Sequence, residues 1–102
     1  MASKYKSIKC LVDGHSFASK KEATHYQKLK LMQRSGLIHS LTLQPEFPIW
    51  INGIKCFTYK ADFSHVENGK RIITDVKGVR TPVYRLKKKC VEAYHHIKIL
   101  EV

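Results

Sequence analysis

Two Asn-Gly pairs constrain the fold of this chain more than any other feature of its sequence. Asn52-Gly53 and Asn68-Gly69 each stand between β-prone stretches. Asn-Gly favours the tight two-residue turn of a hairpin, because both residues tolerate a positive φ. We therefore expect strands over residues 47–51, 54–66 and 70–77. Two such turns in succession predict an antiparallel meander of three strands.

A first helix is predicted before this meander. Ser19 and Glu22 form a capping box, with a serine at the N-cap and a glutamate three residues later. Gly36 is suited to end the helix. Apolar residues recur on one side of it at Ala23, Tyr26, Leu29 and Met32. Ahead of the helix, Asp13-Gly14 predicts a turn between strands at residues 7–12 and 15–18.

A second helix is predicted after the meander. Thr81-Pro82 is a typical helix start, with threonine as the N-cap and proline at the first helical position. An apolar stripe follows at spacings of three and four, at Val83, Leu86, Cys90 and Tyr94. Residues 37–44, which precede Pro45, and residues 97–102 complete the expected strands. The order of elements predicts an α+β or mixed α/β fold.

Chain length and net charge limit the number of domains and the kinds of partner that the chain can have. A chain of 102 residues is expected to form one domain over residues 1–102, with a flexible basic tail at residues 1–6. Lysine and arginine number 19 against 8 acids, and the net charge of +11 suggests a polyanionic partner, most simply nucleic acid. Three widely spaced cysteines predict reduced thiols, and no segment approaches the length of a membrane span. We expect a soluble intracellular protein with no membrane partner.

An acid and a lysine stand close together at the end of the last meander strand. Because side chains alternate along a strand, Asp75 and Lys77 share one face. Residues equally distant from the Asn68-Gly69 turn should pair, which places Asp62 nearly opposite Asp75. Paired side chains approach to roughly 4.5–5.5 Å at Cβ, where two like charges are destabilising. A cation between the two carboxylates would remove that repulsion.

With Glu22, these residues complete the order Glu, Asp, Asp-x-Lys, which resembles the PD-(D/E)XK nuclease superfamily. More narrowly, the chain looks like a family of small phage-encoded proteins in that superfamily. The matching motifs run from Ser19 onward and comprise S-K-K-E at 19–22, L-Q-P at 43–45, A-D-F at 61–63, D-V-K-G at 75–78 and the lysine-rich segment at 85–89. The proline that often precedes the first aspartate of the motif is replaced here by Ala61.

The resemblance implies a restriction-endonuclease-like core, with a central mixed sheet flanked by two helices. It also implies hydrolysis of DNA phosphodiester bonds with Mg²⁺ or Mn²⁺, in the cytoplasm of a bacterial host. Lys77 would position the attacking water or stabilise the phosphate, and Gln44 would have a supporting role. The metal ligands would be Glu22, Asp62, Asp75 and the backbone carbonyl of Val76.

Several lysines and arginines are candidates for contact with DNA phosphates. A helical projection places Arg85, Lys88 and Lys89 opposite the apolar stripe, while Lys87 lies nearer its border and could reach the site. The full predicted set is Lys20, Lys21, Arg80, Arg85, Lys87, Lys88 and Lys89. The alternative is that this basic face is simply solvated.

Other functions fit the same residues. Glu22 could serve only as a helix cap, and Asp62 could be a strand-edge acid paired with a lysine. The chain would then be a non-catalytic nucleic-acid-binding protein. An RNA nuclease on the same fold is a further alternative. We expect His25, His39 and His65 to lie at the surface rather than to bind a metal, and we expect a homodimer, because two-strand cleavage needs two sites.

Overall fold

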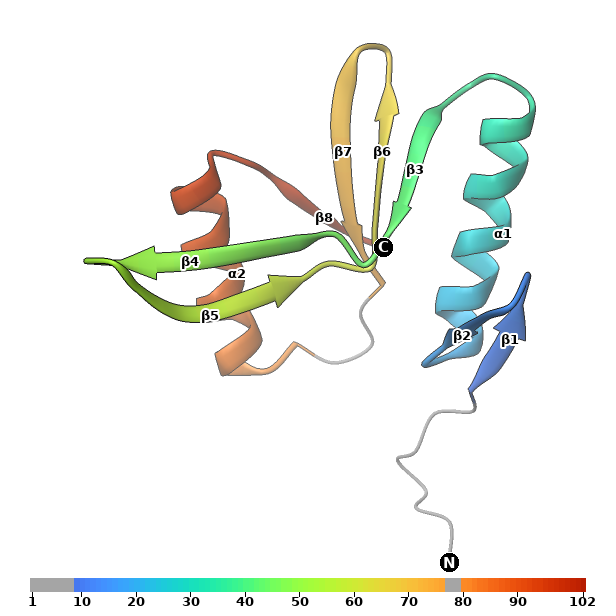
Figure 1. Ribbon diagram of the computed structural model, residues 1–102. Helices are drawn as coiled ribbons and strands as arrows, with labels where there is room; N and C mark the ends of the chain where they lie inside the picture. The colour runs from blue at the N-terminus through green and yellow to red at the C-terminus, as the bar shows by residue number, and fades with distance from the viewer. Residues whose placement is uncertain (1–8, 77–79) are drawn as a thin grey trace, which may run out of the picture.

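The computed structural model describes residues 9–76 and 80–102, whose elements are shown in Figure 1. The helices are α1 (Lys20–Arg34) and α2 (Pro82–His95). The strands are β1 (Cys10–Val12), β2 (His15–Phe17), β3 (His39–Leu43), β4 (Glu46–Ile51), β5 (Ile54–Lys60), β6 (Phe63–Glu67), β7 (Lys70–Asp75) and β8 (Ile99–Glu101). The expected tail at residues 1–6, together with Lys77 and Gly78, lies outside the described residues.

The central sheet has four strands in the order β3-β6-β7-β8. β3, β6 and β7 pair antiparallel, whereas β7 and β8 run parallel. Figure 1 shows α1 on one side of this sheet, and α2 with the β4-β5 hairpin on the other. The predicted mixed α/β fold, with a mixed sheet and two flanking helices, is confirmed at this level. The restriction-endonuclease-like core stays a prediction.

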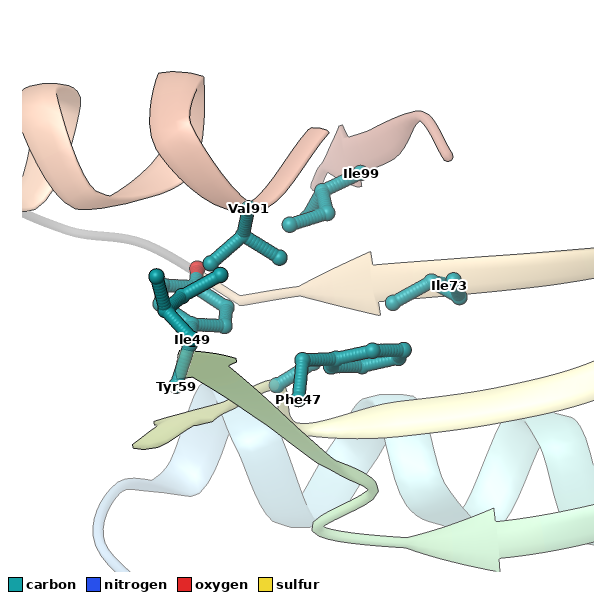
Figure 2. Close-up of a cluster of buried hydrophobic side chains, with 7 residues drawn as sticks. Phe47, Ile49, Tyr59, Ile73, Val91 and Ile99 are labelled. Atoms are coloured by element: carbon teal, nitrogen blue, oxygen red, sulfur yellow. The ribbon is translucent and has the colours of Figure 1, made fainter. Parts of the chain in front are cut away.

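Each face of the central sheet is covered by its own hydrophobic core. The core on the α2 side is drawn in Figure 2 and comprises Phe47, Ile49, Tyr59, Ala61, Ile73, Val91 and Ile99. The core on the α1 side comprises Phe17, Ala23, Tyr26, Leu29, Ile38 and Phe63. Alternation along each strand supplies the two faces, since Ile73 and Thr74 of β7 point to opposite sides. Apolar side chains therefore cover part of each face of the sheet.

The predicted three-stranded meander is wrong, although both Asn-Gly hairpins form. The expected strand over residues 54–66 is broken at Ala61-Asp62, and β4-β5 forms a separate two-stranded sheet. The reason lies in the packing. Tyr59 and Ala61 belong to the core under α2, whereas Phe63 belongs to the core under α1. One regular strand would place these three side chains on a single face, so the chain must turn between Ala61 and Phe63.

The first hairpin and α1 follow the sequence prediction. β1 and β2 pair around Asp13-Gly14. Ser19 is the N-cap of α1, and its Oγ accepts a hydrogen bond from the backbone N–H of Glu22 at 3.1 Å. At the other end, Gly36 takes a φ of 84°. There the N–H groups of Gly36 and Leu37 donate to the carbonyls of Gln33 and Met32, which is the Schellman arrangement.

The start of α2 is predicted correctly, but its buried face is not. The side chain of Thr81 accepts from the N–H of Tyr84, and Pro82 occupies the first turn. Val83, Leu86 and Tyr94 of the predicted apolar stripe are 61%, 63% and 46% exposed.

The face of α2 that packs against the protein is instead the one that carries Tyr84, Val91 and His95. Its polar side chains bind neighbouring elements. Tyr84 donates to Glu101 at 2.7 Å, and His95 Nε2 donates to the carbonyl of Pro48 at 2.8 Å. Val91, the buried residue of the helix, lies between them along this face. The prediction that Lys88 lies on the solvated face of α2 is therefore wrong. Lys88 is half-buried, and its Nζ lies 3.9 Å from Glu101.

Candidate functional site

The predicted proximity of Asp62 and Asp75 is confirmed. The β6-β7 register pairs Glu67 with Lys70 and Phe63 with Thr74, so that Asp62 and Asp75 are the next residues outward. The backbone N–H of Asp62 donates to Asp75 Oδ1 at 3.0 Å, and the N–H of Val76 donates to Asp62 Oδ2 at 2.7 Å.

These two hydrogen bonds offset the repulsion expected between the two carboxylates. The Asp75 carboxylate accepts from the N–H of Asp62, and the Asp62 carboxylate accepts from the N–H of Val76. A carboxylate that accepts backbone N–H bonds is stabilised in its charged form. The two acids can therefore lie close together without a cation between them. Their proximity alone does not require a metal.

Asp75 is fully buried on the α2 side of the sheet. Its Oδ2 accepts a hydrogen bond from the hydroxyl of Tyr59, whose ring stacks on that of Tyr84 at a centroid distance of 6.4 Å. Burial, and next the hydrogen bond to Asp75, raise the pKa of Tyr59 far above its usual value. The phenol therefore keeps its proton and acts as a donor. The sequence reasoning missed Tyr59, which is recognisable only once β5 is seen to pass over the end of β7.

Glu22 and Asp62 line a common cleft of about 150 Å³. Glu22 stands on the first turn of α1, where the Ser19 cap fixes the start of the helix, and Asp62 stands at the bend between β5 and β6. Gln44 contributes to the same wall, and the remaining lining residues are His15, Ser16, Phe17 and Leu43. The structure thus brings together three of the predicted site residues, drawn from three separate segments.

Gln44 has an unusual backbone. Its φ is 50°, in the left-handed region that costs a non-glycine residue free energy. Its N–H donates to the carbonyl of Asp62 at 2.9 Å, and the carbonyl of the next residue, Pro45, accepts from Ala61. This pair of bonds anchors Gln44 to the bend that carries Asp62. The strained backbone is consistent with the supporting role predicted for Gln44.

The other predicted site residues are less closely gathered. Asp75 is not among the residues that line the cleft, Val76 follows it directly on the chain, and Lys77 lies outside the described residues. Among the described residues, no three His, Cys, Asp or Glu side chains are grouped as a ready-made metal site. The side-chain oxygens of the described residues at the cleft are those of the Glu22 and Asp62 carboxylates, the Gln44 amide and the Ser16 hydroxyl.

The predicted DNA-contacting residues fall into two groups. Lys20 and Lys21 are exposed on the first turn of α1, beside the cleft. The remainder belong to the α2 side. Arg80 donates to Glu101 at 2.9 Å and Lys87 Nζ lies 5.4 Å from the centre of the Phe57 ring, while Arg85 and Lys89 are exposed.

The surface placement expected for the histidines holds for His39 only. His25 is half-buried and His65 is 5% exposed. His65 lies on the sheet face that α1 covers, one pleat along β6 from Phe63. Alternation along β6 places His65 on the same face as Phe63, and the covering of this face by α1 overrides the usual exposure of a histidine.

The comparison with known families identifies one match. The family described as "Protein of unknown function (DUF1064)" matches residues 2–101. The chain belongs to this family. The match covers nearly the whole chain, including every predicted site residue, but the description of DUF1064 names no activity. No curated protein and no solved structure is significantly similar to the chain. The resemblance to PD-(D/E)XK nucleases thus stays a prediction.

No helix within residues 9–76 and 80–102 combines the length and the apolar character needed to cross a membrane.

Proposed function

We propose that this protein is a divalent-metal-dependent DNA endonuclease that hydrolyses phosphodiester bonds. The observation that carries the proposal is the convergence of Glu22, Asp62 and Gln44 on one cleft. Asp62 is bonded to the N–H of Val76, so the cleft lies beside the chain segment that leads directly to Lys77. Carboxylates that can hold a metal ion, with a lysine nearby to stabilise charge on the phosphate, are groups suited to metal-assisted hydrolysis.

The donors at the cleft suit Mg²⁺ or Mn²⁺. Hard divalent cations bind oxygen, and Mg²⁺ commonly uses one or two protein carboxylates together with water and substrate phosphate. Glu22 and Asp62 supply two carboxylates, and the Gln44 amide supplies a neutral oxygen. When bound, the metal would lower the pKa of its water and neutralise charge on the phosphate. Lys77 would orient the attacking water, and Asp75 would hold the backbone of Asp62 in place through its Oδ1.

The charge of the chain supports a nucleic-acid substrate. The net charge is +11 over 102 residues, and proteins that bind nucleic acid gain much of their affinity from lysine and arginine contacts to phosphate. Lys20 and Lys21 stand directly before Glu22 in the sequence, so positive charge adjoins the proposed catalytic cleft. A homodimer remains part of the proposal, since it would place two such clefts on a duplex.

The direct test is cleavage of supercoiled plasmid, a four-way junction and single-stranded DNA with Mg²⁺, Mn²⁺ or a chelator. Wild-type protein should cut at least one of these substrates with either metal and none with chelator. Asp62→Asn should cleave far more slowly than wild type. Glu46→Gln is the matched control, because Glu46 is an exposed acid of β4 that faces Lys60 at 3.9 Å, and it should cut as wild type does. Absence of wild-type cleavage under all these conditions would refute the proposal.

The second candidate is a non-catalytic nucleic-acid-binding protein. A specific observation favours it, namely that both Asp75 oxygens accept hydrogen bonds from protein groups, Tyr59 and the N–H of Asp62. On this alternative the acids stabilise the bend between β5 and β6, and the basic residues bind DNA without cutting it. DNA binding that persists in chelator, without cleavage of any substrate in Mg²⁺ or Mn²⁺, would support it over the nuclease.

A further inference from the structure

A second cleft, of about 300 Å³, lies between α1 and the end of β7. It is lined by Lys21, Thr24, His25, Lys28, Val76 and Val102. Lys21, His25 and Lys28 occupy positions i, i+4 and i+7 of α1, so they share one face of the helix. None of the described residues that line it is acidic. The described part of the cleft therefore presents basic groups without a carboxylate on its walls.

This basic cleft adjoins the acidic one. Lys21 precedes Glu22 on the first turn of α1, and Val76 is the residue whose N–H binds the carboxylate of Asp62. The two clefts thus share the start of α1 and the end of β7. A polymer with regularly spaced negative groups could have one group at a metal ion held by Glu22 and Asp62 and another at Lys21 and Lys28.

The electrostatics of the second cleft favour an anion. Burial is the main cause that lowers the pKa of His25, and the positive charge of Lys28 and the proximity of His65 lower it further. His25 is also in ring contact with Phe63 of β6, at a centroid distance of 5.6 Å. Burial alone says nothing of the sign of the local potential, but the contribution of Lys28 shows that its positive charge acts on the position of His25. An anion entering the cleft would reduce the repulsion between that charge and a proton on His25.

Two buried polar atoms lie on the sheet face beneath α1. His65 Nδ1 and Thr74 Oγ1 have no hydrogen-bond partner among the described residues, and both side chains are at least nine-tenths buried. Thr74 pairs with Phe63 across the β6-β7 ladder, and His65 is two residues from Phe63 on β6. Both belong to the face that carries Phe63 and Val76. Buried polar groups are rarely left without a partner, so the sheet face behind the cleft has hydrogen-bonding capacity that residues 9–76 and 80–102 do not use.

We propose that this cleft binds a phosphodiester group of the DNA backbone next to the one that is cut, with Lys21 and Lys28 as its charged ligands and His25 as a hydrogen-bonding one. This inference rests on the proposed nuclease function. The subsite would fix the register of the strand relative to Glu22 and Asp62 without reading sequence, because phosphate contacts position a protein on DNA but carry no base information. The apolar part of the wall, from Val76 and Val102, would pack against the sugar.

The test measures binding of a short labelled duplex by fluorescence anisotropy over a range of salt concentrations, with chelator present so that no cleavage occurs. The variant is Lys28→Gln, and the matched control is Lys30→Gln. Lys30 is two residues further along α1 and lines a different cleft, with Asp13 and Arg34. Lys28→Gln should reduce the slope of log K against log salt by about one, the change expected for one lost phosphate contact. Lys30→Gln should leave the slope unchanged.

Equal slopes for Lys28→Gln and Lys30→Gln would overturn the subsite. Both lysines carry their charge on the surface of the same helix, so general electrostatic attraction would affect them alike, whereas a built subsite would not. His25→Gln gives a second variant, which should weaken binding at constant salt without changing the melting temperature by more than the control does. The cleavage assay on wild-type protein separates the two hypotheses. Cleavage with equal slopes refutes the subsite alone, and no cleavage with unequal slopes refutes the nuclease alone.

Discussion

Removal of the Tyr59 hydroxyl should destabilise the protein strongly, because this hydroxyl is a hydrogen-bond donor to a fully buried carboxylate. Asp75 accepts from the hydroxyl of Tyr59 and from the N–H of Asp62, and its side chain is 0% exposed. Tyr59→Phe retains the ring, so the packing against Tyr84 and the core of Figure 2 should persist. The cost is then that of the lost bond rather than of a cavity.

The magnitude follows from the chemistry of the bond. A hydrogen bond to a charged group contributes about 1.5–3 kcal/mol, and a buried acceptor left unsatisfied costs a similar amount. We expect Tyr59→Phe to lower the free energy of unfolding by about 2 kcal/mol. In a domain of about 100 residues each kcal/mol shifts the melting temperature by about 4–8 °C, so the variant should melt about 8–16 °C below wild type.

The assay is thermal unfolding at neutral pH, followed by circular dichroism, with Tyr94→Phe as the matched control. Tyr94 is 46% exposed on α2, and loss of its hydroxyl should change the free energy of unfolding by no more than about 0.5 kcal/mol. Equal melting temperatures for the two variants would refute the reasoning, since they would show that the Tyr59 hydroxyl does not stabilise Asp75.

Three further predictions concern single side chains. Thr74→Val should raise the free energy of unfolding by about 1 kcal/mol, measured by denaturant titration, because it removes a buried hydroxyl that has no partner among the described residues; a lower stability would show that the hydroxyl is bonded. Ser19→Ala should cost about 1 kcal/mol of stability with cleavage preserved, whereas Glu22→Gln, which keeps the backbone N–H that donates to Ser19, should be stable but slow; a fully active Glu22→Gln would leave Glu22 as a cap only. Tyr84→Phe should destabilise the protein at neutral pH and less so in acid. The hydrogen bond from Tyr84 is the main cause that lowers the pKa of Glu101, so this stabilisation is present above the ordinary glutamate pKa of about 4.3 and is lost as pH falls through the lower folded value. Melting temperatures of Tyr84→Phe and wild type that differ equally at neutral and acid pH would contradict it.

Local features of the sequence predicted local structure well. Both Asn-Gly turns, the Ser19 cap and the Gly36 ending depend on residues within a few positions of each other, and all form as expected. The pairing of Asp62 with Asp75 followed from one of these turns, because a two-residue hairpin fixes the register of both strands.

Features that depend on distant parts of the chain could not be predicted in the same way. The bend at Asp62 exists because Tyr59 and Phe63 belong to the cores under different helices. The sequence of the strand itself does not indicate which helix each residue will contact. The buried face of α2 is set by hydrogen bonds to Glu101 and Pro48, which lie in other elements. An apolar stripe at helical spacing shows that a face is apolar, but not which face the tertiary contacts will cover.

The candidate site was also predicted in part from the sequence, and the rest of it depends on distant contacts. Glu22, Gln44 and Asp62 were selected by their order and by resemblance, and the fold brings them to one cleft. The burial of Asp75 under Tyr59 was not predicted, since it requires the separate β4-β5 hairpin to lie over the end of β7. Sequence spacing gave the proximity of the two aspartates but not the direction in which each carboxylate points.

The central claim is that Glu22 and Asp62 act together on one metal at one cleft. A double-mutant cycle on the cleavage rate tests it most directly, using Glu22→Gln, Asp62→Asn and the combined variant, each with saturating DNA and Mg²⁺. Residues that act as a unit give strongly non-additive effects. The account predicts that the double variant cleaves no more slowly than the slower single variant. Defects that multiply, or full activity in either single variant, would contradict it.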